Sequence, residues 1–168
     1  MREICSDSKF SVNLNQAPLR LQTEVTVRRT PLDVATFLGD VRNIPLWDRG
    51  VANVRAASEA KPGVGFAFET VGHPGSAAGA EDGRMAYEVS SVDANGSTVR
   101  LTSTTGNARY FRDAAWHFRL DPVPVGTRIT CIAEFTLRRR YLWLAPVFYL
   151  MRRAIREDLE RLRRTLEA

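Results

Sequence analysis

The stretch VFYLMRRAIREDLERLRRTL at residues 147–166 decides the fold. Its apolar residues recur at steps of three and four, which is the spacing of one face of an α-helix: Phe148, Met151, Ile155, Leu159, Leu162 and Leu166. The sequence therefore predicts one long helix that ends the chain. Pro146 lacks an amide donor, so it should start this helix or kink it. An apolar helix face of this length needs a large apolar surface beneath it, and a curved antiparallel sheet supplies one.

The residues before this helix are typical of a β-sheet with one helical insertion. Residues 19–27 alternate between apolar and polar side chains, as a half-buried strand does. Thr30 can cap a helix, Pro31 fits its first position and Asp33 can complete a capping box, so a helix should begin there. Further strands are predicted at residues 51–57, 64–70, 84–92, 97–104, 114–120 and 127–137.

The length of the chain, 168 residues, is that of one domain. We expect residues 1–18 to form an N-terminal extension and residues 19–168 to form the domain. Residues 1–16 lack the apolar core of a signal peptide, and the longest apolar run, 141–151, has about half the length of a membrane span. These observations predict a soluble, cytoplasmic protein.

The net charge of +5 is concentrated at the C-terminal end. From Arg138 onward there are nine arginines and four carboxylates, and this difference of five equals the charge of the whole chain. Arginine and glutamate residues about one turn apart typically form a solvated helix face, and the alternative is a surface that binds anions. No pattern of exposed stacking aromatics accompanies the charge, so we expect no nucleic-acid partner.

Few residues offer catalytic chemistry. His73 follows a predicted strand within a glycine-rich segment and His117 lies on the polar side of another strand, so no metal site and no histidine triad is predicted. The chain has no phosphate-binding glycine loop, no GxSxG and no CxxC pattern, and we expect no cofactor. Cys5 and Cys131 match no metal or disulfide spacing and are interpreted as free thiols, Cys131 as a small buried apolar residue.

Strand alternation places one set of side chains, Val64 included, on the sheet face toward the long helix. A sheet covered by a single helix leaves room for a cavity, so these side chains are candidate ligand contacts as well as core residues. Tyr87 is the candidate catalytic residue, because a buried phenol can donate a hydrogen bond or act as a general acid; the alternative is a core tyrosine with a satisfied hydroxyl. The predicted ligand contacts are Phe66, Phe68, Met85, Tyr87, Leu101, Trp116, Phe118, Phe135, Phe148 and Met151.

The order of these elements resembles the START-like superfamily, also called SRPBCC, and within it the polyketide cyclase/dehydrase-like proteins. The matching segments are residues 30–47, 61–66, 116–128 and 152–167. This resemblance implies an α+β helix-grip fold, in which a seven-stranded antiparallel sheet wraps around a long C-terminal helix, with short helices after the first strand. It also implies a hydrophobic cavity for a polyketide, lipid, sterol or quinone, and in some members cyclisation or dehydration of that ligand.

Function is left between three classes. The first is a binding protein for a hydrophobic small molecule. The second is a polyketide cyclase or dehydratase that uses Tyr87 and an arginine from a loop, such as Arg109 or Arg112. The third is an interaction module that uses the basic C-terminal helix on an acidic partner or a membrane.

The apolar run before the helix predicts a contact surface. Tyr141, Trp143, Leu144 and Tyr149 exceed what one helix face can bury, so part of this surface should stay exposed beside residues 138–140. A homodimer interface is our first expectation for it. Peripheral contact with an anionic membrane is the second.

Overall fold

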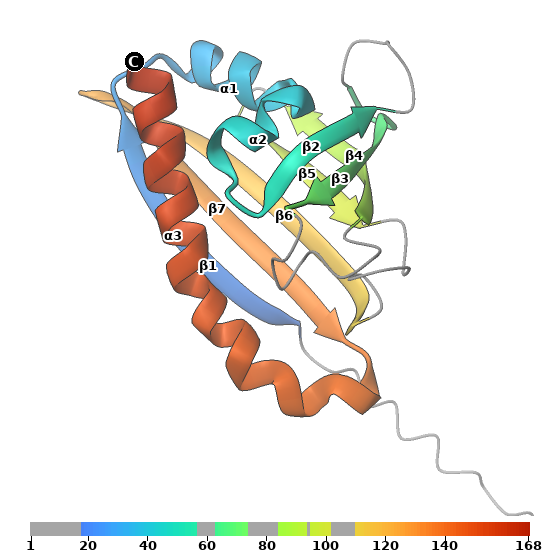
Figure 1. The fold of residues 1–168 in the computed structure, drawn as a ribbon. Coiled ribbons are helices and arrows are strands. Elements are labelled where there is room, and N and C mark those ends of the chain that lie inside the picture. Colours follow the sequence, from blue (N-terminus) through green and yellow to red (C-terminus); the bar gives the residue numbers. More distant parts are fainter. Residues whose placement is uncertain (1–17, 57–62, 74–83, 94, 102–109) are drawn as a thin grey trace, which may run out of the picture.

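A computed structural model describes residues 18–56, 63–73, 84–93, 95–101 and 110–168. Within these residues the strands form a seven-stranded sheet in the order β1-β7-β6-β5-β4-β3-β2, in which every neighbouring pair is antiparallel. The long helix α3 crosses one face of this sheet (Figure 1). The predicted fold class, an antiparallel sheet with a long C-terminal helix, is confirmed.

The chain places β1 and β2 at opposite edges of the sheet, and the short helices α1, η1 and α2 connect the two edges. From β2 to β7 each strand then pairs with the next one along the chain. The elements in order are β1 (Leu19–Val27), α1 (Pro31–Gly39), η1 (Val41–Asn43), α2 (Ile44–Trp47), β2 (Val51–Ala56), β3 (Ala67–Gly72), β4 (Arg84–Asp93), β5 (Gly96–Leu101), β6 (Phe111–Val123), β7 (Gly126–Leu137), η3 (Arg139–Leu144) and α3 (Ala145–Glu167).

The predicted helix starts are present. The hydroxyl of Thr30 accepts a hydrogen bond from the backbone N–H of Asp33 at 3.2 Å, and the Asp33 carboxylate accepts one from the backbone N–H of Thr30 at 3.4 Å. This capping box fixes the first turn of α1. Pro146 lies in the first turn of α3, where its missing N–H leaves no helical hydrogen bond unmade, so it starts the helix and does not kink it.

Two side chains differ in exposure from what strand alternation predicts. Val64 is 69% exposed, because residues 63–66 form a turn in which Gly65 has a φ of 82°, and β3 begins only at Ala67. Thr130 lies on the face away from α3, as the alternation of residues 127–137 predicts, but it is buried there. Its register partners are Glu24 on β1 and Arg119 on β6, whose longer side chains flank it on that face.

Two groups of buried side chains make up the core. The larger group joins α3 to β1, β6 and β7, and it includes Val27, Ile129 and Leu162, which have no exposed surface. The smaller group lies around β3 and β4 and includes Phe68 and Tyr87. The side chains of Met85 and Trp116 pack against both groups, so the space between the groups is where a cavity can form.

In the described part of the chain, no helix has both the length and the apolar content that crossing a membrane requires.

Candidate functional site

A cavity of about 360 Å³ lies between the sheet, α2 and α3. Aromatic and aliphatic side chains make up most of its wall, and carboxyl, hydroxyl, thiol and guanidinium groups complete it. α2 and the turn after it contribute Ile44, Trp47, Asp48, Arg49 and Gly50; strands β2 to β4 contribute Val51, Phe68, Thr70, Gly72, Met85 and Tyr87; β6 and β7 contribute Trp116, Phe118 and Cys131; α3 contributes Met151, Ala154, Ile155, Asp158 and Leu159.

The structure brings part of the predicted ligand-contact set together at this cavity. The residues of that set that line it are Phe68, Met85, Tyr87, Trp116, Phe118 and Met151. They come from β3, β4, β6 and α3, so the alternation of the strands and the periodicity of the helix converge on one space. Leu101 belongs to β5, and its side chain lies outside the described part of the structure.

Three predicted wall residues are not on the cavity, which corrects the sequence-based set. The rings of Phe135 and Phe148 both pack on Phe111, at centroid distances of 5.2 Å, and fill the end of the core next to η3. Phe66 precedes β3 and is buried in the smaller core group. Strand alternation and helix periodicity give the face on which a residue lies but not its position along that face, and this is why these aromatics were assigned to the wall.

Three charged residues of the cavity wall, Asp48, Arg49 and Asp158, were not predicted from the sequence. The ring of Trp47 packs edge-on against Phe118 at 5.9 Å, and both Trp47 and the next residue, Asp48, line the cavity. Asp158 lies between Ile155 and Leu159, two members of the apolar stripe of α3. An acidic residue at the border of such a stripe is the signal that could have identified it.

Asp48 is the cavity's most perturbed carboxyl group. The backbone N–H of Gly50 donates a hydrogen bond to its Oδ1 at 2.7 Å. Burial, followed by the nearby Asp158 carboxylate, raises the pKa of Asp48 to about 6, against the lowering effect of backbone N–H groups and of Arg161. Asp48 therefore changes its charge near pH 6.

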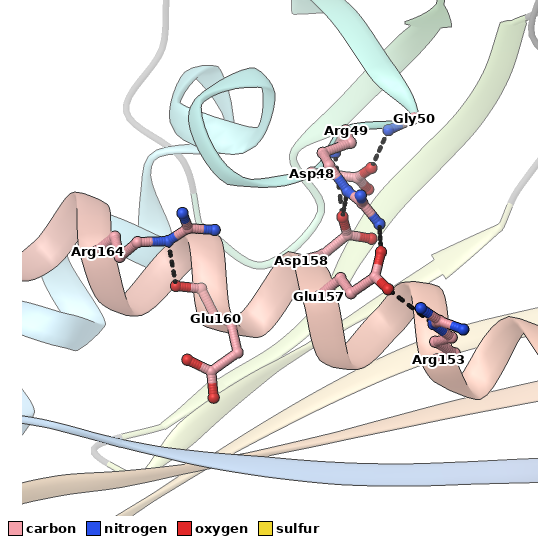
Figure 2. Close-up of polar contacts among 8 residues, drawn as sticks. All are labelled: Asp48, Arg49, Gly50, Arg153, Glu157, Asp158, Glu160 and Arg164. Atoms are coloured by element: carbon pink, nitrogen blue, oxygen red, sulfur yellow. Dashed lines mark hydrogen bonds and ion pairs between the residues drawn. The ribbon is translucent and has the colours of Figure 1, made fainter.

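Arg49 is one of the residues that line the cavity. Figure 2 shows that its side chain connects the turn after α2 to α3. Its Nε donates to Asp158 Oδ1 at 3.0 Å and its Nη2 to Glu157 Oε2 at 2.5 Å. Glu157 also accepts from Arg153 Nε at 3.0 Å, and these two arginines hold the pKa of Glu157 below its usual range. The contacts form a partly exposed clamp that couples α2 to the middle of α3.

Tyr87 and Cys131 are neutral groups in the wall. Burial raises the pKa of Tyr87 well above its ordinary value, against a hydrogen bond with Trp116, and the phenol hydroxyl lies 3.5 Å from the sulfur of Met85. Burial likewise raises the pKa of the Cys131 thiol to about 12. At neutral pH Tyr87 can donate a hydrogen bond but cannot act as a base, and Cys131 is not a thiolate nucleophile.

The other predicted polar candidates that the structure describes do not line the cavity. Arg112 is exposed on β6, where the pairing with β7 is irregular, and it does not line the cavity. Arg109 lies outside the described residues. His117 is on the outer face of the sheet, with its Nε2 at 3.4 Å from Glu134. The described residues include no group of three or more His, Cys, Asp or Glu side chains placed to hold a metal ion.

The chain matches one protein-family model, and its fold is similar to that of many solved structures. The model of a family described as polyketide cyclase/dehydrase and lipid transport matches residues 18–167. No curated protein matches the chain.

Solved structures resemble the whole fold at low sequence identity. Norcoclaurine synthase from Thalictrum flavum, in complex with dopamine and hydroxybenzaldehyde, has a TM-score of 0.65 and 12% identity over 96% of this chain and 97% of that one. Major latex-like protein 151 from Panax ginseng has a TM-score of 0.68 and 10% identity over 90% and 99% of the two chains. A protein from Mesorhizobium loti has a TM-score of 0.64 and 16% identity over 88% and 96%. At these identities the likeness is one of fold.

Proposed function

We propose that this chain, which belongs to the polyketide cyclase/dehydrase and lipid transport family, binds a hydrophobic small molecule in the cavity beneath α3. The observation that carries the proposal is the cavity itself, which has a volume of about 360 Å³, mostly apolar walls and a few polar groups. Such a site excludes water from an apolar ligand and orients it through its few polar contacts. The ligand class that fits is a polyketide, lipid or quinone-like molecule.

The polar groups of the cavity wall restrict the kind of ligand that fits. Its apolar body would pack against Phe68, Trp116 and Met151, and one end would reach Asp48. The raised pKa of Asp48 reflects a carboxylate whose charge is incompletely compensated. A ligand hydroxyl or amine that donates a hydrogen bond to this carboxylate would supply the missing compensation. We therefore expect a ligand with an apolar body and a donor group at one end.

The binding proposal is tested first by native mass spectrometry of the purified protein, which should detect a co-purifying organic molecule. Binding is then measured with the neutral fluorescent probe N-phenyl-1-naphthylamine. Met85→Trp places a large ring in the cavity and should weaken probe binding at least about tenfold, which corresponds to about 1.4 kcal/mol. Leu32→Trp, at an exposed position of α1, is the matched control and should bind as the wild type does.

Equal probe affinity in Met85→Trp and in the wild type, with both proteins folded by circular dichroism, would show that the probe binds elsewhere and would count against the cavity as the site.

A second function, dehydration or cyclisation of the bound molecule, is favoured by one observation: Asp48, with its pKa of about 6, shares the cavity with the neutral phenol of Tyr87. Ionised Asp48 can take a proton from a carbon next to a ketone and return it to a departing hydroxyl group, so that water leaves and Asp48 is regenerated. The phenol of Tyr87 can donate a hydrogen bond to the ketone oxygen as it gains negative charge.

Turnover of an aromatic β-hydroxyketone tests this second function. The rate should rise with pH through an apparent pKa near 6, and Asp48→Asn should lower kcat by a factor of roughly 10² to 10⁴. Tyr87→Phe should retain binding and lose part of the rate. Turnover unaffected by Asp48→Asn would exclude the carboxylate as the base, and no turnover of such ketones by a protein that binds them would leave binding as the function.

A further inference from the structure

Outside the cavity, η3 and the first two turns of α3 form a surface that combines exposed apolar side chains with arginines. Trp143 is 72% and Leu150 is 74% exposed, and Leu142, Val147 and Tyr149 are also exposed. This surface, which we call the tip surface, lies at the end of α3 farthest from α1, drawn in orange in Figure 1. Large apolar side chains gathered on one exposed surface indicate a contact with something less polar than water.

The charged side chains of the tip surface are arginines, so the surface is positively charged. From residue 138 to residue 156, which covers the tip surface and the next turn of α3, the sequence contains six arginines and no aspartate or glutamate. Among the described ion pairs, Arg153 is the member of this group that has a carboxylate partner, Glu157. Arg139, Arg140, Arg152 and Arg156 are exposed, and in the described part of the chain no carboxylate lies within ion-pair distance of them. The guanidinium of Arg140 lies over the ring of Tyr141 at 4.7 Å from its centroid, which orients this arginine at the surface.

We propose that the tip surface docks the protein on an anionic lipid membrane. Apolar side chains such as Leu150 can enter the boundary between headgroups and acyl chains while nearby arginines contact lipid phosphates. Trp143 and Tyr149 are of the residue types that favour the membrane–water interface, because each has an apolar ring and one polar atom. The inference goes beyond the proposed function, since it concerns a surface outside the cavity and does not depend on what fills the cavity.

A second copy of this chain fits the tip surface less well. A two-fold dimer brings the same patch of both copies together, so each arginine of the tip surface would face the arginines of its partner. Between residues 138 and 156 there is no carboxylate to balance that charge, and like charges across an interface oppose association. An anionic bilayer supplies both the opposite charge and an apolar phase.

The position of the tip surface relates it to the cavity. Met151 and Ala154, which follow the tip surface directly on α3, line the cavity. Docking through η3 and the first turns of α3 would therefore bring the cavity-lining part of this helix close to the bilayer. An apolar ligand that moves between membrane and cavity would cross little water.

Flotation of the full chain with lipid vesicles tests the proposal. We expect the protein to float with vesicles that contain phosphatidylserine and phosphatidylcholine at low salt, and to be released by high salt or by vesicles of phosphatidylcholine alone. Arg139→Gln combined with Arg140→Gln should weaken this binding by roughly tenfold or more, and Trp143→Ala or Leu150→Ser by roughly fivefold.

The matched control is Arg163→Gln combined with Arg164→Gln, two adjacent exposed arginines at the other end of the same helix, and it should float as the wild type does. Every variant should bind N-phenyl-1-naphthylamine normally without vesicles. Probe binding therefore tests the cavity proposal and flotation tests the docking proposal, and either can fail without the other.

The proposal would be overturned if the protein did not float with anionic vesicles at low salt. It would also be overturned if the two double arginine variants lost vesicle binding to the same extent. Sedimentation that shows a dimer dissociated by Leu150→Ser would also overturn it and would assign the tip surface to a second copy of the chain.

Discussion

The two halves of α3 differ in how far their apolar side chains are buried. In the C-terminal half, Ile155, Leu159, Leu162 and Leu166 are all buried against the sheet. In the N-terminal half, Val147, Tyr149 and Leu150 are more than half exposed. Around the middle of the helix, one side lines the cavity, through Met151, Ala154, Ile155, Asp158 and Leu159. One continuous helix thus carries a stabilising segment, a cavity wall and an exposed surface, and its apolar content alone does not tell these roles apart.

The largest expected effect tests the C-terminal half. Leu162 has no exposed surface, so Leu162→Ala removes buried contacts and leaves a void; we expect the free energy of unfolding to fall by about 2–5 kcal/mol. Urea unfolding followed by circular dichroism measures the loss. A change of less than about 0.5 kcal/mol would mean that this half of the helix is not part of the core and would remove the contrast between the halves.

The second prediction concerns the polar side of the cavity. Burial raises the pKa of Asp48 to about 6 in the folded protein from a usual value of 3.8. The folded state therefore holds this proton more tightly than the unfolded state does, and stability from this group declines as pH rises from about 4 to about 6. Above pH 6 the ionised carboxylate costs the folded state on the order of 2–3 kcal/mol.

Asp48→Asn should accordingly be more stable than the wild type near pH 7 and similar to it near pH 4, as measured by urea unfolding at both values. Asp40→Asn is the control of opposite sign, because a hydrogen bond from the Arg42 side chain holds the pKa of Asp40 below its usual range. That substitution should not stabilise the protein at neutral pH. Equal stability of Asp48→Asn and the wild type at both pH values would contradict the burial of this carboxyl group.

A smaller effect is expected where α2 is clamped to the middle of α3. Arg49 and Glu157 are both partly exposed, so Arg49→Gln should lower the free energy of unfolding by less than about 1 kcal/mol. Its larger consequence should be kinetic, with faster release of N-phenyl-1-naphthylamine in stopped-flow measurements because the cavity rim opens more readily. Arg42→Gln, which breaks an exposed ion pair away from the cavity, should leave the release rate unchanged.

The smallest effect on stability belongs to the N-terminal half. Leu150→Ser exchanges an exposed apolar side chain for a polar one, so the free energy of unfolding should change by less than about 0.5 kcal/mol. The same urea titration that measures Leu162→Ala checks it. A loss above about 2 kcal/mol would show that Leu150 is covered in the folded protein, and the tip surface would then be part of the core.

Local patterns were sufficient to predict the elements of this fold. The stripe from Phe148 to Leu166 predicted α3, the capping box at Thr30 predicted α1, and the alternation of residues 19–27 predicted β1. These patterns depend only on the repeat of a helix or a strand and on hydrogen bonds between residues three apart, which is why they can be read without knowing the partner surfaces.

The candidate site needed the tertiary structure. Sequence alternation placed Phe68, Tyr87 and Phe135 on one face, but only the packing of Phe135 against Phe111 and Phe148 separates core aromatics from cavity aromatics. The charged residues of the cavity wall were missed for a similar reason. Asp48 and Asp158 are 110 positions apart in the sequence and become neighbours only when α2 packs on α3.

By itself, the sequence determined the order of the elements, the buried face of each of them and the basic charge of the last helix. Those properties follow from near neighbours along the chain. The tertiary structure decided which apolar side chains fill the core, which line the cavity and which stay exposed at the tip surface, and it raised the pKa of Asp48. These outcomes depend on distances between segments far apart in the chain, because burial and the electrostatic field at a group are set by everything that packs around it.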